Sequence, residues 1–67
     1  MRIEHYEKYT WRDGRVQEIV LFKNENFHLE TWSRFNDNEE WTTDEVHRVL
    51  TAEEVKNIME DYKNGKI

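Results

Sequence analysis

Apolar and polar residues alternate over the first third of the chain. The alternation runs through residues 2–11 and again through residues 16–23, with Arg12-Asp13-Gly14-Arg15 between the two runs. Alternation of this kind is typical of half-buried strands, and Asp-Gly between two such runs is one of the strongest hairpin signals in a sequence. We therefore expect a β-hairpin with a two-residue Asp-Gly loop, in which Glu7 lies opposite Val20.

Two further strands are expected after this hairpin. The polar residues 23–26 predict a second turn, and residues 27–35 predict a third strand that returns alongside the second. Another polar stretch then precedes a fourth strand, which the pattern places within residues 40–50. Because the length of the preceding loop sets the register of this strand, Trp41 falls on one side of the sheet or the other.

The C-terminal part of the chain predicts one amphipathic helix. Thr51-Ala52-Glu53-Glu54 has the spacing of a capping box, and Asn64-Gly65 is a typical helix end. Between them, apolar residues recur at helical spacing, namely Ala52, Val55, Ile58, Met59 and Tyr62. The chain therefore predicts a single small α+β domain over residues 1–67, an antiparallel four-stranded meander sheet with one C-terminal helix packed on one face.

The alternation leaves apolar residues on both faces of the predicted sheet. The face under the helix is expected to carry Ile3, Trp11, Val16, Val20, Phe22, Phe27, Leu29 and Phe35. The outer face is expected to carry Tyr6, Ile19, Leu21 and Trp32, with Trp41 beside them in one register of the fourth strand. Full burial of such a side chain stabilises a protein by roughly 1.5–3 kcal/mol, and one helix covers only one face. We therefore interpret the outer face as a contact surface, for another protein or for a second copy in a homodimer.

A plainer interpretation of the outer face stays open. Tyr6 and Trp32 are amphipathic, and they can lie flat on the sheet with the aliphatic stems of Lys8 and Arg34 around them. Tyr and Trp are enriched in binding hot spots, however, which favours the contact surface.

Acidic residues outnumber basic ones by 15 to 10, so the net charge is −5 with neutral histidines. The excess lies in the second half of the chain. The densest part, called the acidic run below, consists of Asp37, Glu39, Glu40, Asp44 and Glu45. Solubility and the capping of the following helix are one explanation. The other is docking onto a basic surface, such as the nucleic-acid channel of a larger protein, which complementary charge would orient.

Arginines and aromatic residues suggest a competing ligand. The expected pairings place Arg12, Arg15 and Arg34 side by side at one end of the sheet, close to Trp32. Such a platform suits single-stranded nucleic acid or a phosphate group, because bases stack on aromatic rings and guanidinium groups hold phosphates. Asp13 between two of the arginines and the negative net charge count against this alternative.

Motifs that carry chemistry are not found in the sequence. There is no cysteine, and the three histidines, His5, His28 and His47, do not have the close spacing of metal ligands. Glycine-rich phosphate loops and nucleophile motifs are missing as well. We therefore expect no enzyme, no metal and no cofactor. No apolar stretch approaches the roughly 18 residues of a transmembrane helix, and the chain does not open with a signal-like segment, so a cytoplasmic location is expected.

The residues carry no motif of a known family. In length, negative charge and lack of cysteine, the chain is similar in general type to small accessory and inhibitor proteins of phages and mobile elements, which bind and block a larger host protein. We therefore expect a non-catalytic protein-interaction module. Its outer-face aromatic residues would supply the apolar contact, and the acidic run would orient it toward a basic, nucleic-acid-handling partner.

Overall fold

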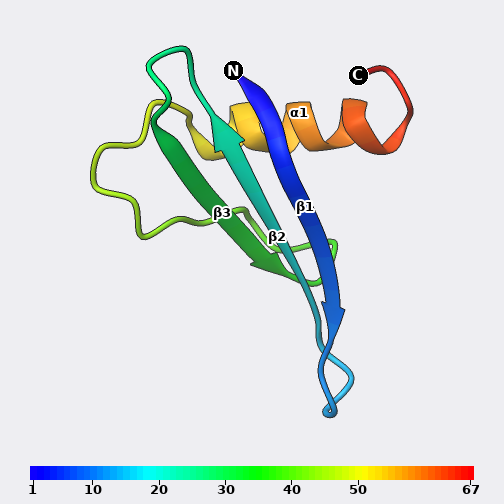
Figure 1. The fold of residues 1–67 in the computed structure, drawn as a ribbon. Coiled ribbons are helices and arrows are strands. Elements are labelled where there is room, and N and C mark those ends of the chain that lie inside the picture. Colours follow the sequence, from blue (N-terminus) through cyan, green and yellow to red (C-terminus); the bar gives the residue numbers. More distant parts are fainter.

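A computed structural model describes all 67 residues of the chain. It contains a three-stranded antiparallel sheet in the order β1-β2-β3, with one helix across one face (Figure 1). The strands are β1 (Arg2–Thr10), β2 (Val16–Lys23) and β3 (Leu29–Phe35), and the helix is α1 (Ala52–Lys63). The small α+β class is as expected. No helix in the structure has the length and apolar character needed to cross a membrane.

The prediction of a fourth strand is wrong. Residues 36–51 form a long loop, and its one β-bridge to the sheet joins Ser33 and Thr42, with N–H···O distances of 2.9 and 2.8 Å. The reason lies in Glu30, whose buried carboxylate accepts hydrogen bonds from the backbone amides of Val49 and Leu50 at 2.7 and 3.2 Å. These amides are therefore bound by a side chain of β3 and do not form a strand ladder.

The first hairpin turns through three residues and not through two. The amide of Trp11 donates to the carbonyl of Arg15 at 2.8 Å, and the amide of Gly14 donates back to Trp11 at 3.0 Å. Gly14 has a φ of 91°, the left-handed conformation that closes such a loop and that glycine adopts without penalty. Tyr6 consequently lies opposite Val20. This shift of one residue moves the side chains of β1 from His5 onward to the face opposite the expected one, whereas the bulge between Ile3 and His5 leaves Ile3 on the core side.

The second hairpin repeats this geometry. The amide of Asn24 donates to the carbonyl of His28 at 3.0 Å, and the third loop residue, Phe27, has a φ of 61°. The Asn24 side chain holds the turn, because its Oδ1 accepts from the amides of Asn26 and His28 at 2.9 Å each. The longer loop again changes the register, and Trp32 lies opposite Val20.

One core lies between the sheet and α1. Its buried apolar residues are Val20, Phe22, Trp32, Trp41, Leu50, Val55 and Met59. Ile3, Tyr6, Ala52 and Ile58 pack against this cluster at partly buried positions. The prediction that Tyr6, Trp32 and Trp41 form an apolar outer face is therefore wrong, because both loop lengths changed the pairing and because Trp41 closes the core from the loop.

The helix prediction is confirmed. The amide of Glu54 donates to Oγ1 of Thr51 at 3.2 Å, and the amide of Thr51 donates to Oε1 of Glu54 at 3.0 Å, which completes the capping box. Acidic residues occupy the first turn, and Lys63 occupies the last one, where each charge suits the helix dipole.

Candidate functional site

The sheet face that points away from α1 carries an unexpected set of residues. Alternation and register place three cross-strand rows on it, Tyr9–Gln17–Phe35, Glu7–Ile19–Ser33 and His5–Leu21–Thr31. Ile19 and Leu21 therefore lie on the outer face where the sequence predicted them, and both are partly buried. Trp11 and Phe35, expected under the helix, belong to this face instead.

Three aromatic residues gather at the far end of the outer face, and we call Tyr9, Trp11 and Phe35 the aromatic cluster. The rings of Tyr9 and Trp11 meet edge to face, with centroids 5.1 Å apart. The guanidinium carbon of Arg15 lies 5.6 Å from the Trp11 ring and 4.8 Å from the Phe35 ring, which is cation–π distance. Nε1 of Trp11 donates to the Gln17 side chain at 3.2 Å. Even so, Tyr9 remains 50% exposed and Trp11 41% exposed.

The β1–β2 hairpin carries this cluster away from the rest of the fold, since its tip extends past α1 and the end of β3 (Figure 1). At the tip, Nε of Arg15 pairs with Oδ2 of Asp13 at 2.8 Å, and the Arg15 amide donates to the other carboxylate oxygen at 3.0 Å. The hydrogen bond from the Arg15 backbone, and then those from its side chain, lower the pKa of Asp13. The loop thereby holds the guanidinium group over the aromatic rings.

The sequence contains a signal for this cluster, but the prediction of a two-residue loop led to the wrong face for Trp11. Arg12-Asp13-Gly14 also suits a three-residue loop, with glycine at its left-handed third position. With that loop, Trp11 becomes the last residue before the turn and faces outward.

On the inner face, Glu18 is the centre of a buried polar network. Its carboxylate accepts from the Tyr6 hydroxyl at 2.6 Å and from Nε of Arg34 at 2.8 Å, and it forms an ion pair with Lys63. Burial by itself would raise the pKa of Glu18, but hydrogen bonds from Lys63, Tyr6 and Arg34 outweigh burial and lower it to about 2. Burial, and then the bond to this carboxylate, raise the pKa of Tyr6 well above its usual value. These groups hold the fold together and are not free to react.

The predicted arginine platform is not assembled. Arg34 points to the inner face, where it also donates to the carbonyl of Asp37 at 3.1 Å and lies 4.7 Å from the ring of Trp41. Arg12 and Arg15 stay in the hairpin tip. The prediction that the three arginines lie side by side was wrong because it depended on the incorrect registers.

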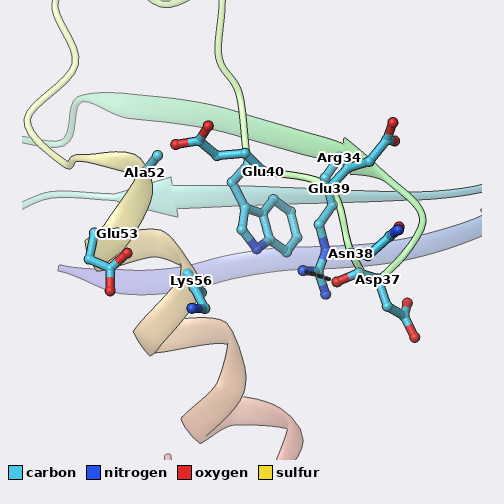
Figure 2. A pocket seen from close by; sticks show the side chains of 9 residues that line it. Arg34, Asp37, Asn38, Glu39, Glu40, Ala52, Glu53 and Lys56 are labelled. Atoms are coloured by element: carbon cyan, nitrogen blue, oxygen red, sulfur yellow. Dashed lines mark hydrogen bonds between the residues drawn. The ribbon is translucent and has the colours of Figure 1, made fainter.

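A shallow hollow of about 420 Å³ opens next to Trp41, between the loop after β3 and the start of α1. Its lining is mixed in charge, with Arg34 and Lys56 among four acidic residues. Figure 2 shows the labelled carboxylates pointing in different directions around the rim. No three histidine or carboxylate side chains in the chain are arranged to hold a metal ion. The hollow therefore offers no recognisable catalytic or metal-binding arrangement.

The acidic run follows the loop on the free side of β3. Within it, only Glu45 is within ion-pair distance of a basic side chain, with Oε1 4.0 Å from Nε2 of His28. Asp37, Glu39, Glu40 and Asp44 have no ion-pair partner.

Part of the acidic run reaches the outer face. Glu39 and Glu40 line a second hollow of about 360 Å³ together with Ser33, Arg34, Phe35 and Thr42. Phe35 belongs to the aromatic cluster, so the cluster and these carboxylates border the same surface.

Comparison with protein-family models, curated proteins and solved structures gives no match for this chain.

Proposed function

We propose that this protein is a non-catalytic interaction module that binds a larger protein through the outer face of its sheet. One observation carries the proposal: Tyr9 and Trp11 are exposed together on the face that α1 does not cover. Tyr, Trp and Arg are the residues most enriched in binding hot spots, and Arg15 lies against the rings of Trp11 and Phe35.

The cluster is held in place before any partner arrives. Gln17 binds the indole nitrogen of Trp11, and Asp13 fixes Arg15 above the ring. Side chains that are already ordered lose less entropy on binding, so more of the burial energy appears as affinity. An apolar patch on the partner would bury the exposed parts of the two rings, which contributes part of the roughly 1.5–3 kcal/mol that full burial of an exposed side chain is worth.

Charge indicates the chemistry of the partner. The net charge is −5, and four carboxylates of the acidic run form no ion pair. Glu39 and Glu40 border the same surface as Phe35. A partner with a basic region next to an apolar patch matches this arrangement, and the complementary charges would speed and orient its docking. The basic surface of a nucleic-acid-handling protein has this character, and a bound module would exclude phosphates from it. That action is typical of a small accessory inhibitor of the phage or mobile-element type.

The test begins with retention of proteins from an extract of the native host on three immobilised baits. These are the wild type, a Tyr9→Ala/Trp11→Ala variant, and Val46→Ala as a matched control, because Val46 is 86% exposed outside the cluster. The proposal requires a protein that the wild type and the control retain and the double variant loses. That protein, once purified, must change the emission of Trp11 on titration, and its affinity must fall as salt is raised.

Two results would contradict the proposal. One is a set of retained proteins that does not depend on the cluster. The other is saturable, salt-sensitive quenching of Trp11 by a short single-stranded oligonucleotide without any protein partner, which would favour nucleic-acid binding at Arg12 and Arg15.

A further inference from the structure

The indole N–H group of Trp41 has no acceptor within the chain. Trp11 and Trp32 donate theirs to the side chains of Gln17 and Glu30, and Trp41 has no such partner. Trp41 is only 2% exposed, yet no fully buried side-chain nitrogen or oxygen lacks a hydrogen bond, so its N–H group reaches the surface. The surface that Trp41 lines is the hollow of about 420 Å³ between the loop after β3 and the start of α1, called the Trp41 hollow below.

Arg34 supplies a second free donor to the same hollow. Its Nε binds Glu18 at 2.8 Å and its Nη1 binds the carbonyl of Asp37 at 3.1 Å, which leaves Nη2 without a partner. The guanidinium group is fixed, because the side chain is only 13% exposed and its Cζ lies 4.7 Å from the Trp41 ring. Arg34 and Trp41 both line the hollow. Their two N–H groups are thus held ready for an oxygen atom that the chain does not supply.

Carboxylates surround these donors. Four acidic residues that form no ion pair line the hollow, namely Asp37, Glu39, Glu40 and Glu53. Glu53 and Lys56 stand on the α1 side, and Asp37 stands on the loop side (Figure 2). The cations of the lining are Arg34, whose charge is offset by the buried Glu18, and Lys56. With four carboxylates against these two cations, the hollow favours a positively charged ligand that also carries an acceptor.

We propose that the Trp41 hollow holds an arginine residue of the partner, with its backbone carbonyl on the N–H groups of Trp41 and Arg34 and its guanidinium group among the carboxylates. A main-chain carbonyl is a strong acceptor. A guanidinium group is weakly hydrated and has donors on several sides, so it suits carboxylates that point in different directions better than an ammonium group does. A volume of about 420 Å³ lies within the range of ligand pockets.

The hollow adjoins the surface proposed for the partner. Arg34, Glu39 and Glu40 line both this hollow and the second one, which borders Phe35 of the aromatic cluster. A partner seated on the aromatic cluster can therefore reach the hollow with one side chain. The source of the arginine rests on the proposed function, whereas the chemistry of the hollow does not.

The test titrates N-acetyl-L-arginine amide into the isotope-labelled full chain and follows the indole N–H signals by NMR. The signal of Trp41 is expected to shift saturably, while those of Trp11 and Trp32, whose N–H groups are already bound, stay in place. N-acetyl-L-citrulline amide is the matched control, because it has the same length and the same carbonyl groups without the charge. It is expected to bind about tenfold more weakly.

Charge variants of the lining are expected to change the affinity in opposite directions. Glu39→Gln/Glu40→Gln removes two acceptors and is expected to weaken binding about tenfold. Lys56→Gln removes the competing ammonium group and is expected to strengthen binding about threefold. Glu25→Gln/Glu60→Gln makes the same change in net charge as the first variant, away from the hollow, and is expected to leave the affinity unchanged. All five side chains are exposed, so the substitutions spare the core.

Several outcomes would overturn the proposal. One is a Trp41 signal that does not move, and another is a citrulline or lysine derivative that binds as tightly as the arginine derivative. Equal affinities of the two double variants would also contradict it. The source of the arginine is tested with the partner that the aromatic cluster retains, which must shift the same Trp41 signal once purified. A complex that leaves this signal in place overturns the assignment to the partner but not the role of the aromatic cluster, so the two proposals can fail separately.

Discussion

The hydroxyl of Tyr6 donates a 2.6 Å hydrogen bond to Oε2 of Glu18, and this bond joins the edge strand β1 to the central strand β2. The same carboxylate binds Arg34 from β3 and Lys63 from α1. One buried side chain of β2 therefore connects every other element of the fold. A buried charge is tolerated at such a position only because its partners surround it.

Removing the charge of Glu18 is expected to destabilise the protein strongly. Glu18→Gln keeps the shape of the side chain but leaves Arg34 without its buried counter-ion, and breaking such a pair costs about 3 kcal/mol or more. That is a large part of the free energy of unfolding of a domain this small. Urea unfolding followed by tryptophan fluorescence measures the loss. The control is Glu7→Gln on the exposed outer face, expected to change stability by less than about 0.5 kcal/mol. Equal effects of the two substitutions would contradict the network.

The low pKa of Glu18 predicts acid sensitivity. Its hydrogen bonds from Lys63, Tyr6 and Arg34 lower the pKa from an ordinary 4.5 to about 2 in the folded chain, so the unfolded state binds more protons between these values. The stabilising contribution is therefore complete above about pH 4.5 and is lost as the pH falls toward 2. Urea midpoints between pH 5 and pH 2 measure this fall. Other carboxyl groups titrate in the same range, so the informative quantity is the difference between the wild type and Glu18→Gln. Parallel pH profiles of the two proteins would contradict the assignment.

The two hairpins predict opposite responses to substitution at the same loop position. Phe27 holds a left-handed φ of 61° while 78% exposed, which is unfavourable for an L-residue by roughly 1–2 kcal/mol. Lys23, 4.8 Å from the ring, offsets part of this cost. Phe27→Gly is therefore expected to stabilise the protein by about 0.5–1 kcal/mol.

Gly14→Ala is expected to destabilise it by about 1 kcal/mol, since φ is 91° there. A Cβ at that position meets no atom within 4 Å, so the cost comes from the backbone alone. Thermal unfolding of the two variants checks both signs. A loss of stability in Phe27→Gly would show that the aromatic ring contributes more than the strain costs.

These loops also explain which parts of the fold were accessible from the sequence. The helix depended on residues within a few positions of one another, as Thr51 and Glu54 show, and local patterns predict such an element reliably. The existence of β1, β2 and β3 was also readable from local patterns. The register of the strands was not readable from local patterns, because adding one residue to a loop changes which residues lie opposite each other. Arg12 belongs to the first loop, and Phe27 in the second loop takes a left-handed conformation that its residue type disfavours.

The fourth strand failed for a non-local reason. The amides of Val49 and Leu50 bind Glu30, a residue far away in the chain, and no pattern within residues 40–50 reveals that contact. The candidate surface was likewise predictable only in its local features. The acidic run was found from composition and is exposed apart from the partly buried Glu45. The aromatic residues were assigned through register, so the sequence placed Tyr6 and Trp32 on the outer face, where the structure has Tyr9 and Trp11.

Tryptophan accessibility distinguishes the two registers directly. Trp11 is 41% exposed, whereas Trp32 and Trp41 are each 2% exposed. Acrylamide, a neutral quencher that the net charge does not repel, is therefore expected to quench Trp11 far more than the other two. Trp11→Phe should remove most of the quenchable emission and should change stability by less than about 1 kcal/mol, since the ring lies outside the core. Trp32→Phe is the matched substitution, and it should leave the quenchable emission in place while lowering stability. With two-residue loops, Trp11 would lie under the helix and Trp32 would face solvent, so the two variants would exchange their behaviour. That exchange would return the aromatic contact to Tyr6 and Trp32 and leave the surface proposed for the partner without its central residues.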